Sequence, residues 1–171
     1  IELMLEQPAA FLDASGRVPI RALLEAGRGR VRSCHLGSYD LTAALDVPGW
    51  AQSTSHPACA TARMLAKLAL AGTGVPLYDG PTTRLPLPLS RGAVTETERA
   101  RDHEAIVSAM AEHAASVRRS LSEGLHAGWD LHPAQIPARL CAVFAAYLGA
   151  RATMTARLSR FLEQRGRATA T

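Results

Sequence analysis

Lysine and aromatic residues are scarce in this chain of 171 residues, and both shortages bear on function. The only lysine, Lys67, lies within a predicted helix, whereas a Schiff-base aldolase needs a buried lysine on a strand. Schiff-base chemistry therefore has no candidate residue here. Aromatic residues make up 5%, and none lies beside the densest basic group, Arg28, Arg30 and Arg32. Nucleic-acid interfaces combine basic faces with aromatics, so the formal net charge of +4 does not indicate a nucleic-acid partner.

Cysteine is also rare, and long apolar runs are missing. Cys34, Cys59 and Cys141 are odd in number and have no metal-ligand spacing, which predicts buried thiols in a reducing compartment and excludes a zinc cluster. No apolar run approaches the roughly 18 residues of a membrane span, and the first residues lack the basic lead of a signal peptide. We therefore predict a cytoplasmic protein with no membrane partner. Neither a glycine-rich phosphate loop nor a nucleophile elbow is present.

Short apolar runs alternate with helical patterns along the chain. Alternation of this kind predicts the α/β class, with a parallel sheet and crossover helices. In the last helix, the periodicity predicts that Leu140, Phe144, Tyr147, Leu158 and Phe161 face inward. The predicted strands are 1–5, 31–36, 74–77 and 128–131, and the predicted helices are 18–26, 57–71, 96–123 and 137–163.

Four such units are half of an eight-unit (β/α)8 barrel, whose usual length is about 250 residues. One interpretation makes 1–165 the C-terminal half of a TIM barrel, with parallel strands alternating with helices and 166–171 as a flexible tail. The chain begins with Ile1 rather than Met, so we expect the N-terminal half of that barrel to be missing. The alternative is a complete, open, doubly wound sheet. Both architectures place the functional site at the carboxyl ends of the strands.

Acidic and histidine side chains follow the predicted strands. Glu6 and Asp40 come after successive strands, whose axes lie about 4.8 Å apart if they pair. Two carboxylates so close repel unless a proton or cation is shared, and a hard cation such as magnesium resolves this. The equally weighted alternative is that both are solvated acids that cap the following helices. His35, Asp79, Asp130 and His132 also lie at or near the ends of predicted strands and are candidate lining residues.

The histidines allow structural explanations as well. His35 is predicted to be a core or lining residue, and His56 to cap the helix that begins at Pro57. We expect His103, His113 and His126 to lie on the surface. For the last predicted strand, the structural alternative is that His132 caps the final helix and Asp130 pairs with an arginine.

Several motifs together resemble the citrate lyase beta-subunit and malyl-coenzyme A lyase superfamily, whose members are phosphoenolpyruvate/pyruvate-type barrels. The closest resemblance is to a poorly characterised aldolase-like subgroup with Glu-Thr-Pro, Gly-Thr-Tyr-Asp, a His-Pro-Ala helix start and Trp-Asp-Leu-His-Pro-Ala-Gln. The corresponding segments here are Glu6-Gln-Pro8, Gly37-Ser-Tyr-Asp40, His56-Pro-Ala58 and 129–135. Each motif is short, but their order and combination are specific.

The resemblance implies a metal-dependent carbon–carbon lyase, in which Glu6 and Asp40 bind Mg²⁺ (or Mn²⁺). It implies that a 2-oxo or 3-hydroxy acid, or its acyl thioester such as an acyl-coenzyme A, reacts through a metal-stabilised enolate in a homo-oligomer. The family's substrate-binding arginine is expected in the missing half, so the catalytic residues stay unknown. The residues implied to line the pocket are His35, Gly37, Ser38, Tyr39, Asp79, Asp130 and His132.

Two departures from the family pattern put the use of coenzyme A in doubt more than they do the binding of a metal. Gln7 replaces the usual hydroxyl residue after the glutamate, and the segment 13–26 lengthens the spacing between Glu6 and Asp40. The alternatives are an acyl-thioester hydrolase or a phosphoenolpyruvate-type enzyme on the same barrel. A non-catalytic relic that binds a ligand or partner is a further alternative.

Overall fold

The computed structural model describes residues 1–92 and 94–168, with side chains described as far as residue 166. A small parallel sheet lies at its centre, with strand order β1-β2-β3. In the register of β1 and β2, Leu5 pairs with Leu36, so both strands end at the same level. The predicted α/β class is confirmed. The strands are β1 (Glu2–Leu5), β2 (Ser33–Leu36) and β3 (Leu77–Tyr78).

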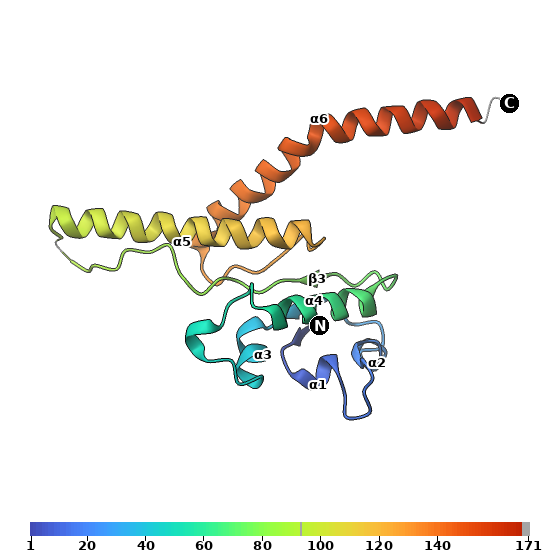
Figure 1. Ribbon diagram of the computed structural model, residues 1–171, viewed down its shortest axis with the longest axis horizontal. Coiled ribbons are helices and arrows are strands. Elements are labelled where there is room, and N and C mark those ends of the chain that lie inside the picture. The colour runs from blue at the N-terminus through green and yellow to red at the C-terminus, as the bar shows by residue number, and fades with distance from the viewer. Residues whose placement is uncertain (93, 169–171) are drawn as a thin grey trace.

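Four helices surround the apolar face of this sheet (Figure 1). Leu5, Cys34 and Leu36 point from the strands into a core that also contains Cys59 and Ala66 of the longest of these helices. Because side chains alternate across a strand, the neighbouring strand residues occupy the opposite face. The four helices are α1 (Pro8–Phe11), α2 (Ile20–Ala26), α3 (Ser38–Ala44) and α4 (Pro57–Leu70), and a 3₁₀ turn, η1 (Gly49–Ala51), follows α3.

Two long helices form the second half of the chain. Helix α5 (Glu96–Ser122) begins with a capping box, in which the Thr95 hydroxyl and the Glu98 carboxylate each bond the other residue's backbone N–H. Helix α6 (Ile136–Ala168) follows the 3₁₀ turn η2 (Pro133–Gln135), crosses α5 and extends away from the body (Figure 1). The tail predicted from residue 166 is helical through Ala168, and 169–171 lie outside the described residues.

The fourth predicted strand, 128–131, is reduced to a single parallel bridge between Asp79 and Gly128. Side chains take the backbone groups that a ladder would use. Arg139 donates to the Trp129 carbonyl at 2.8 Å, and the Leu131 N–H donates to the Gln135 side chain at 2.8 Å. The prediction of a strand here was wrong for this reason.

The predicted inward face of α6 is also wrong. The small side chains of Ala138 and Ala142 are buried and let α6 approach α5 closely, whereas the large apolar side chains point the other way. The small side chains of α6, which allow a close approach to α5, therefore decide how these two helices pack, rather than the stripe of large apolar side chains. The five residues predicted inward are each 48–60% exposed: Leu140, Phe144, Tyr147, Leu158 and Phe161.

Candidate functional site

The carboxyl ends of β1 and β2 bring Glu6 next to Gly37. A Cβ atom built on Gly37 would lie 2.5 Å from the Glu6 Cβ and 2.6 Å from its Oε2, so the glutamate side chain occupies the space that glycine leaves. Asp40 lies three residues further on, exposed in the first turn of α3. The Gly37 N–H donates to the Leu5 carbonyl at 3.0 Å, which ties the two strand ends together. Glycine is thus required here by a close approach.

The two residues between Gly37 and Asp40 differ in exposure. The Ser38 side chain is buried, and its hydroxyl has no hydrogen-bond partner in the described part of the chain. Tyr39 is half-buried, and its backbone carbonyl accepts a bond from the Thr42 hydroxyl at 3.0 Å. The Ser38 hydroxyl lies near Gly80, where a built Cβ atom would be 3.5 Å from its oxygen, so it points toward the segment that follows β3.

His35 lies on the sheet face opposite the apolar core. Its Nε2 is 3.1 Å from a Glu2 carboxylate oxygen, and the other Glu2 oxygen accepts from the Ser33 hydroxyl at 2.8 Å. The imidazole contacts the rings of Tyr78 and Trp129 edge-on, at centroid distances of 4.9 and 5.7 Å. In a closed barrel this face would line the lumen, and the lining role of His35 stays a prediction.

Asp79 has a different role from the lining role predicted for it. It is 2% exposed and points into the layer between α4 and α5. Its carboxylate accepts from Arg119 at 3.0 Å and from the Ser120 hydroxyl at 2.8 Å, and one of its oxygens lies 3.6 Å from Arg63. Asp79 is therefore part of a buried ion network that joins the end of β3 to two helices.

Arg63 is the centre of this network and the largest fully buried side chain. It donates to the Thr54 carbonyl at 2.8 Å and to both carboxylate oxygens of Glu123, at 2.5 and 3.2 Å. The sequence does offer a signal for it, because Arg63 lies within the otherwise largely apolar predicted helix 57–71. A charge within a buried helix face needs a partner on another element.

A second buried network holds Asp130. Arg139 donates to both of its carboxylate oxygens at 2.8 Å, and His113 Nε2 lies 2.8 Å from one of them. The expected arginine pair is therefore present. The expected caps are also present: the His132 ring accepts from the Ala134 N–H at 3.1 Å, and the His56 ring accepts from Ala58.

His113 was predicted on the surface, and it is 1% exposed instead. The reason is that the inner face of α5 is polar. The Thr82 hydroxyl lies 2.9 Å from His113 Nδ1, while Gln135 donates to the same hydroxyl at 3.1 Å. The hydroxyl proton is therefore directed at Nδ1, and a neutral His113 donates from Nε2 to Asp130. The buried residues of this face are Asp102, Ala109, His113, Ser116, Val117 and Ser120.

This network makes stability depend on pH. Burial lowers the pKa of His113 below the ordinary value of a histidine, about 6.5. The hydrogen bond to Asp130 opposes this shift, and the charge of Arg139 adds to it. As the pH falls, the imidazole of His113 is protonated in the unfolded chain before it is protonated in the folded protein. The stability that neutral His113 contributes is therefore complete above about pH 6.5 and is lost as the pH falls through the lowered pKa. We expect the melting temperature of His113→Gln to fall less between pH 7.5 and 5.5 than that of the unsubstituted protein. His103→Gln, on the exposed side of α5, should keep the original slope; equal slopes for all three proteins would contradict the assignment.

Metal-ligand clusters and membrane-spanning helices are both lacking among the residues that the structure describes. Within 1–92 and 94–168, no cluster of three or more His, Cys, Asp or Glu side chains could hold a metal ion. No helix in the described part is long and apolar enough to cross a membrane. A metal at Glu6 and Asp40 would consequently have two protein carboxylates and take its other ligands from water or substrate.

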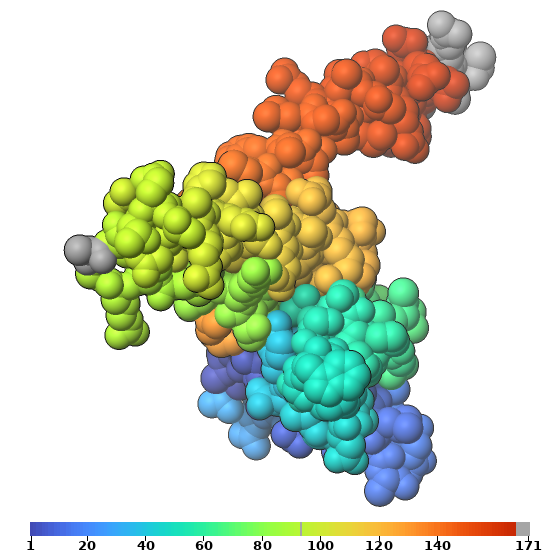
Figure 2. Space-filling model, turned by 60° about the vertical axis from the view of Figure 1, so that its left-hand side comes forward, coloured from blue at the N-terminus to red at the C-terminus, as the bar shows by residue number. Residues whose placement is uncertain are grey.

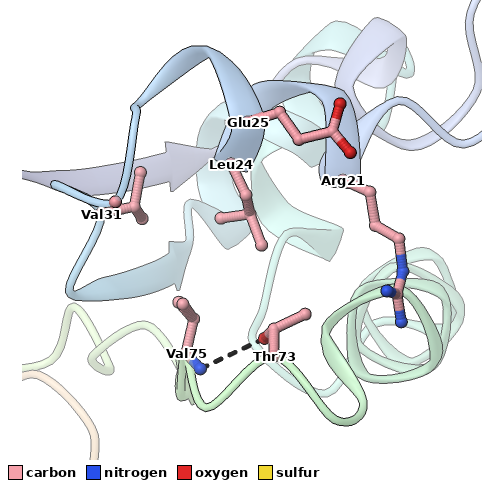
Figure 3. A pocket seen from close by; sticks show the side chains of 7 residues that line it. Arg21, Leu24, Glu25, Val31, Thr73 and Val75 are labelled. Carbon is pink, nitrogen blue, oxygen red and sulfur yellow. Dashed lines mark hydrogen bonds between the residues drawn. The ribbon is translucent and has the colours of Figure 1, made fainter.

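A pocket of about 290 Å³ lies at the opposite ends of the strands (Figure 3). Leu24, Val31 and Val75 surround it, and the Val75 N–H donates to the Thr73 hydroxyl at its rim. In parallel barrels, that end of the sheet serves stability rather than chemistry. We therefore assign the candidate site to the Glu6–Asp40 edge.

The family model described as "Domain of unknown function (DUF6986)" matches residues 1–171. The chain belongs to the DUF6986 family. The comparison with curated proteins gives no match. The DUF6986 chain is similar to the crystal structure of a citrate lyase from Burkholderia xenovorans LB400, with 19% sequence identity and a TM-score of 0.52.

That similarity covers 99% of the DUF6986 chain and 53% of the citrate lyase chain, so this chain spans about half the length of the enzyme. At this identity the likeness shows the fold. The parallel α/β arrangement is compatible with part of a barrel.

Proposed function

We propose that this DUF6986 chain carries the metal-binding edge of a magnesium-dependent carbon–carbon lyase, which acts on a 2-oxo or 3-hydroxy acid or its acyl thioester. The observation that carries the proposal is the position of Glu6, which lies against Gly37 at the carboxyl end of the sheet with Asp40 in the next helical turn. The citrate lyase likeness supports the scaffold. The reaction is inferred from the resemblance of the sequence motifs to the citrate lyase beta-subunit and malyl-coenzyme A lyase superfamily.

The residues present fit a hard cation. Within the described part of the chain, neither Glu6 nor Asp40 makes a hydrogen bond or ion pair with a protein group, so both carboxylates are available as ligands. Mg²⁺ keeps several waters and uses one or two carboxylates together with substrate oxygens. A two-carboxylate site at the open edge of a sheet meets that requirement, whereas a structural zinc site, with four protein ligands, does not fit.

The surrounding residues define what the edge can do. Gly37 leaves room for the Glu6 carboxylate at the strand ends, and the neighbouring Ser38 has a buried hydroxyl. The rings of Tyr78 and Trp129 contact His35 edge-on. When bound, a divalent cation supplies the positive charge that an enolate oxygen needs.

The test is proton exchange catalysed by the natural protein that contains this chain. We expect it to incorporate deuterium from D₂O into carbon 3 of pyruvate or a longer 2-oxo acid, because enolate formation removes that proton. Proton NMR should show exchange with Mg²⁺ or Mn²⁺ and none after EDTA. Exchange that persists in EDTA, or no exchange with any 2-oxo acid, would contradict the lyase.

The same samples separate the alternatives. A thioester hydrolase would release free thiol from an acyl-coenzyme A whether or not it exchanges the acid's proton. A ligand-binding relic would bind the acid, measured by calorimetry, without exchange. Either result would overturn the proposed lyase reaction but would leave the Glu6–Asp40 edge as the ligand-binding site.

A further inference from the structure

Helix α6 projects from the body as an arm (Figures 1 and 2). It carries a stripe of exposed apolar side chains. The stripe residues repeat with alternating spacings of four and three over three heptads: Leu140, Phe144, Tyr147, Arg151, Met154, Leu158 and Phe161. This spacing is the a/d repeat of a coiled coil, in which each side chain inserts between residues of a facing helix. We refer to these seven residues as the α6 seam.

The seam is exposed along its whole length. Its six apolar members are 46–60% exposed, and Leu148 and Leu162 beside it are 62% and 56% exposed. The Tyr147 hydroxyl lies 2.9 Å from His126 Nδ1, and the Tyr147 side chain is nevertheless 54% exposed. Contiguous apolar surface of this extent marks an interaction site.

Charge restricts what can cover the seam. Residues 150–171 contain five arginines and one acid, so this segment carries the whole formal charge of +4. In a parallel pair of α6 helices, Arg151 would face Arg151 of the other copy. In an antiparallel pair with the two-fold axis between residues 152 and 153, Arg151 instead faces Met154, and its methylene stem can pack while its guanidinium reaches water.

We propose that α6 pairs antiparallel with α6 of a second copy of this chain. In this register, Phe144 meets Phe161 and Tyr147 meets Leu158 of the other copy, and no two arginines oppose each other across the seam. The contact is isologous and therefore closes as a two-fold dimer. Given the exposed area of these side chains, the helices would bury roughly 800 Å² per copy, the size of a standard specific interface.

The first test measures association by sedimentation velocity over a range of protein concentrations. We expect a dimer, and we expect Phe161→Glu to raise its dissociation constant about 100-fold, because an unpaired carboxylate would be buried in the seam. Leu68→Glu is the matched control: Leu68 is 65% exposed on α4 and lies outside the seam, so its dissociation constant should stay unchanged. Both side chains are exposed, so both variants are expected to fold, and circular dichroism is the measurement that checks this.

The second test reads the orientation. In the variant Cys141→Ser, Phe144→Cys, Phe161→Cys, mild oxidation should give a covalent dimer. Peptide mapping should join position 144 of one copy to position 161 of the other. Links of 144 to 144 and 161 to 161 would show a parallel pair and overturn the proposal.

Two other outcomes also overturn it. The first is a monomer at every concentration that binds vesicles containing phosphatidylserine, with binding lost in Phe161→Glu; this would make the arm a membrane-surface helix. The second is a dimer whose dissociation constant does not respond to Phe161→Glu, which would place the interface elsewhere.

Discussion

Arg63→Ala is expected to destabilise the fold by about 3–5 kcal/mol, the cost of removing one partner from a buried ion network. Arg63 and Asp79 are each 2% exposed, and Arg63 also satisfies the Thr54 carbonyl and the Glu123 carboxylate. Its loss leaves Asp79 with Arg119, Ser120 and the Gly80 N–H as partners, and opens a cavity between α4 and α5. For a chain of this size, the melting temperature should fall by about 10 °C or more.

The measurement is thermal unfolding followed by circular dichroism, with Arg84→Ala as the control. Arg84 pairs with Glu112 at 3.7 Å on the surface, where both side chains are about half exposed. Such a pair contributes at most about 1 kcal/mol. If the two substitutions changed the melting temperature equally, the buried network would not hold α4, α5 and the end of β3 together.

Glu6→Gln and Asp40→Asn are each expected to lower the affinity for Mn²⁺ at least about 100-fold, since even changes to residues behind the ligands cost 10–100-fold. Gly37→Ala should weaken binding by a different route. The new methyl group would overlap the Glu6 Cβ, which is close to the backbone, so the end of β1 must shift and carry the carboxylate away.

Electron paramagnetic resonance of free Mn²⁺ gives the affinity directly and does not require a substrate. Asp46→Asn, an exposed acid just beyond α3, and Gly49→Ala, whose Cβ position is open, are the matched controls and should bind like the unsubstituted protein. Unchanged Mn²⁺ affinity of the Glu6→Gln variant would show that Glu6 is not a metal ligand and would overturn the proposed metal site. The deuterium exchange experiment then tests the reaction separately.

Local patterns were sufficient for most of the secondary structure. The predicted helices 57–71 and 96–123 agree with α4 and α5 to within one residue at each end, because Pro57, Thr95 and the terminal glycines set these boundaries locally. The third strand was placed too early: Gly74 adopts a left-handed conformation and Pro76 has no N–H to donate, so β3 begins only at Leu77.

The sequence by itself determined the parallel α/β alternation and therefore the meeting of Glu6 with the Gly37–Asp40 segment, because neighbouring parallel strands end at one edge. Only the tertiary structure decided which way a side chain points when two faces of a helix compete. It buried Arg63 and His113, for which partners on other elements compensate, and it turned the alanine face of α6 onto α5. Periodicity reports that a stripe exists, but the partner that covers it is set by contacts far apart in the chain.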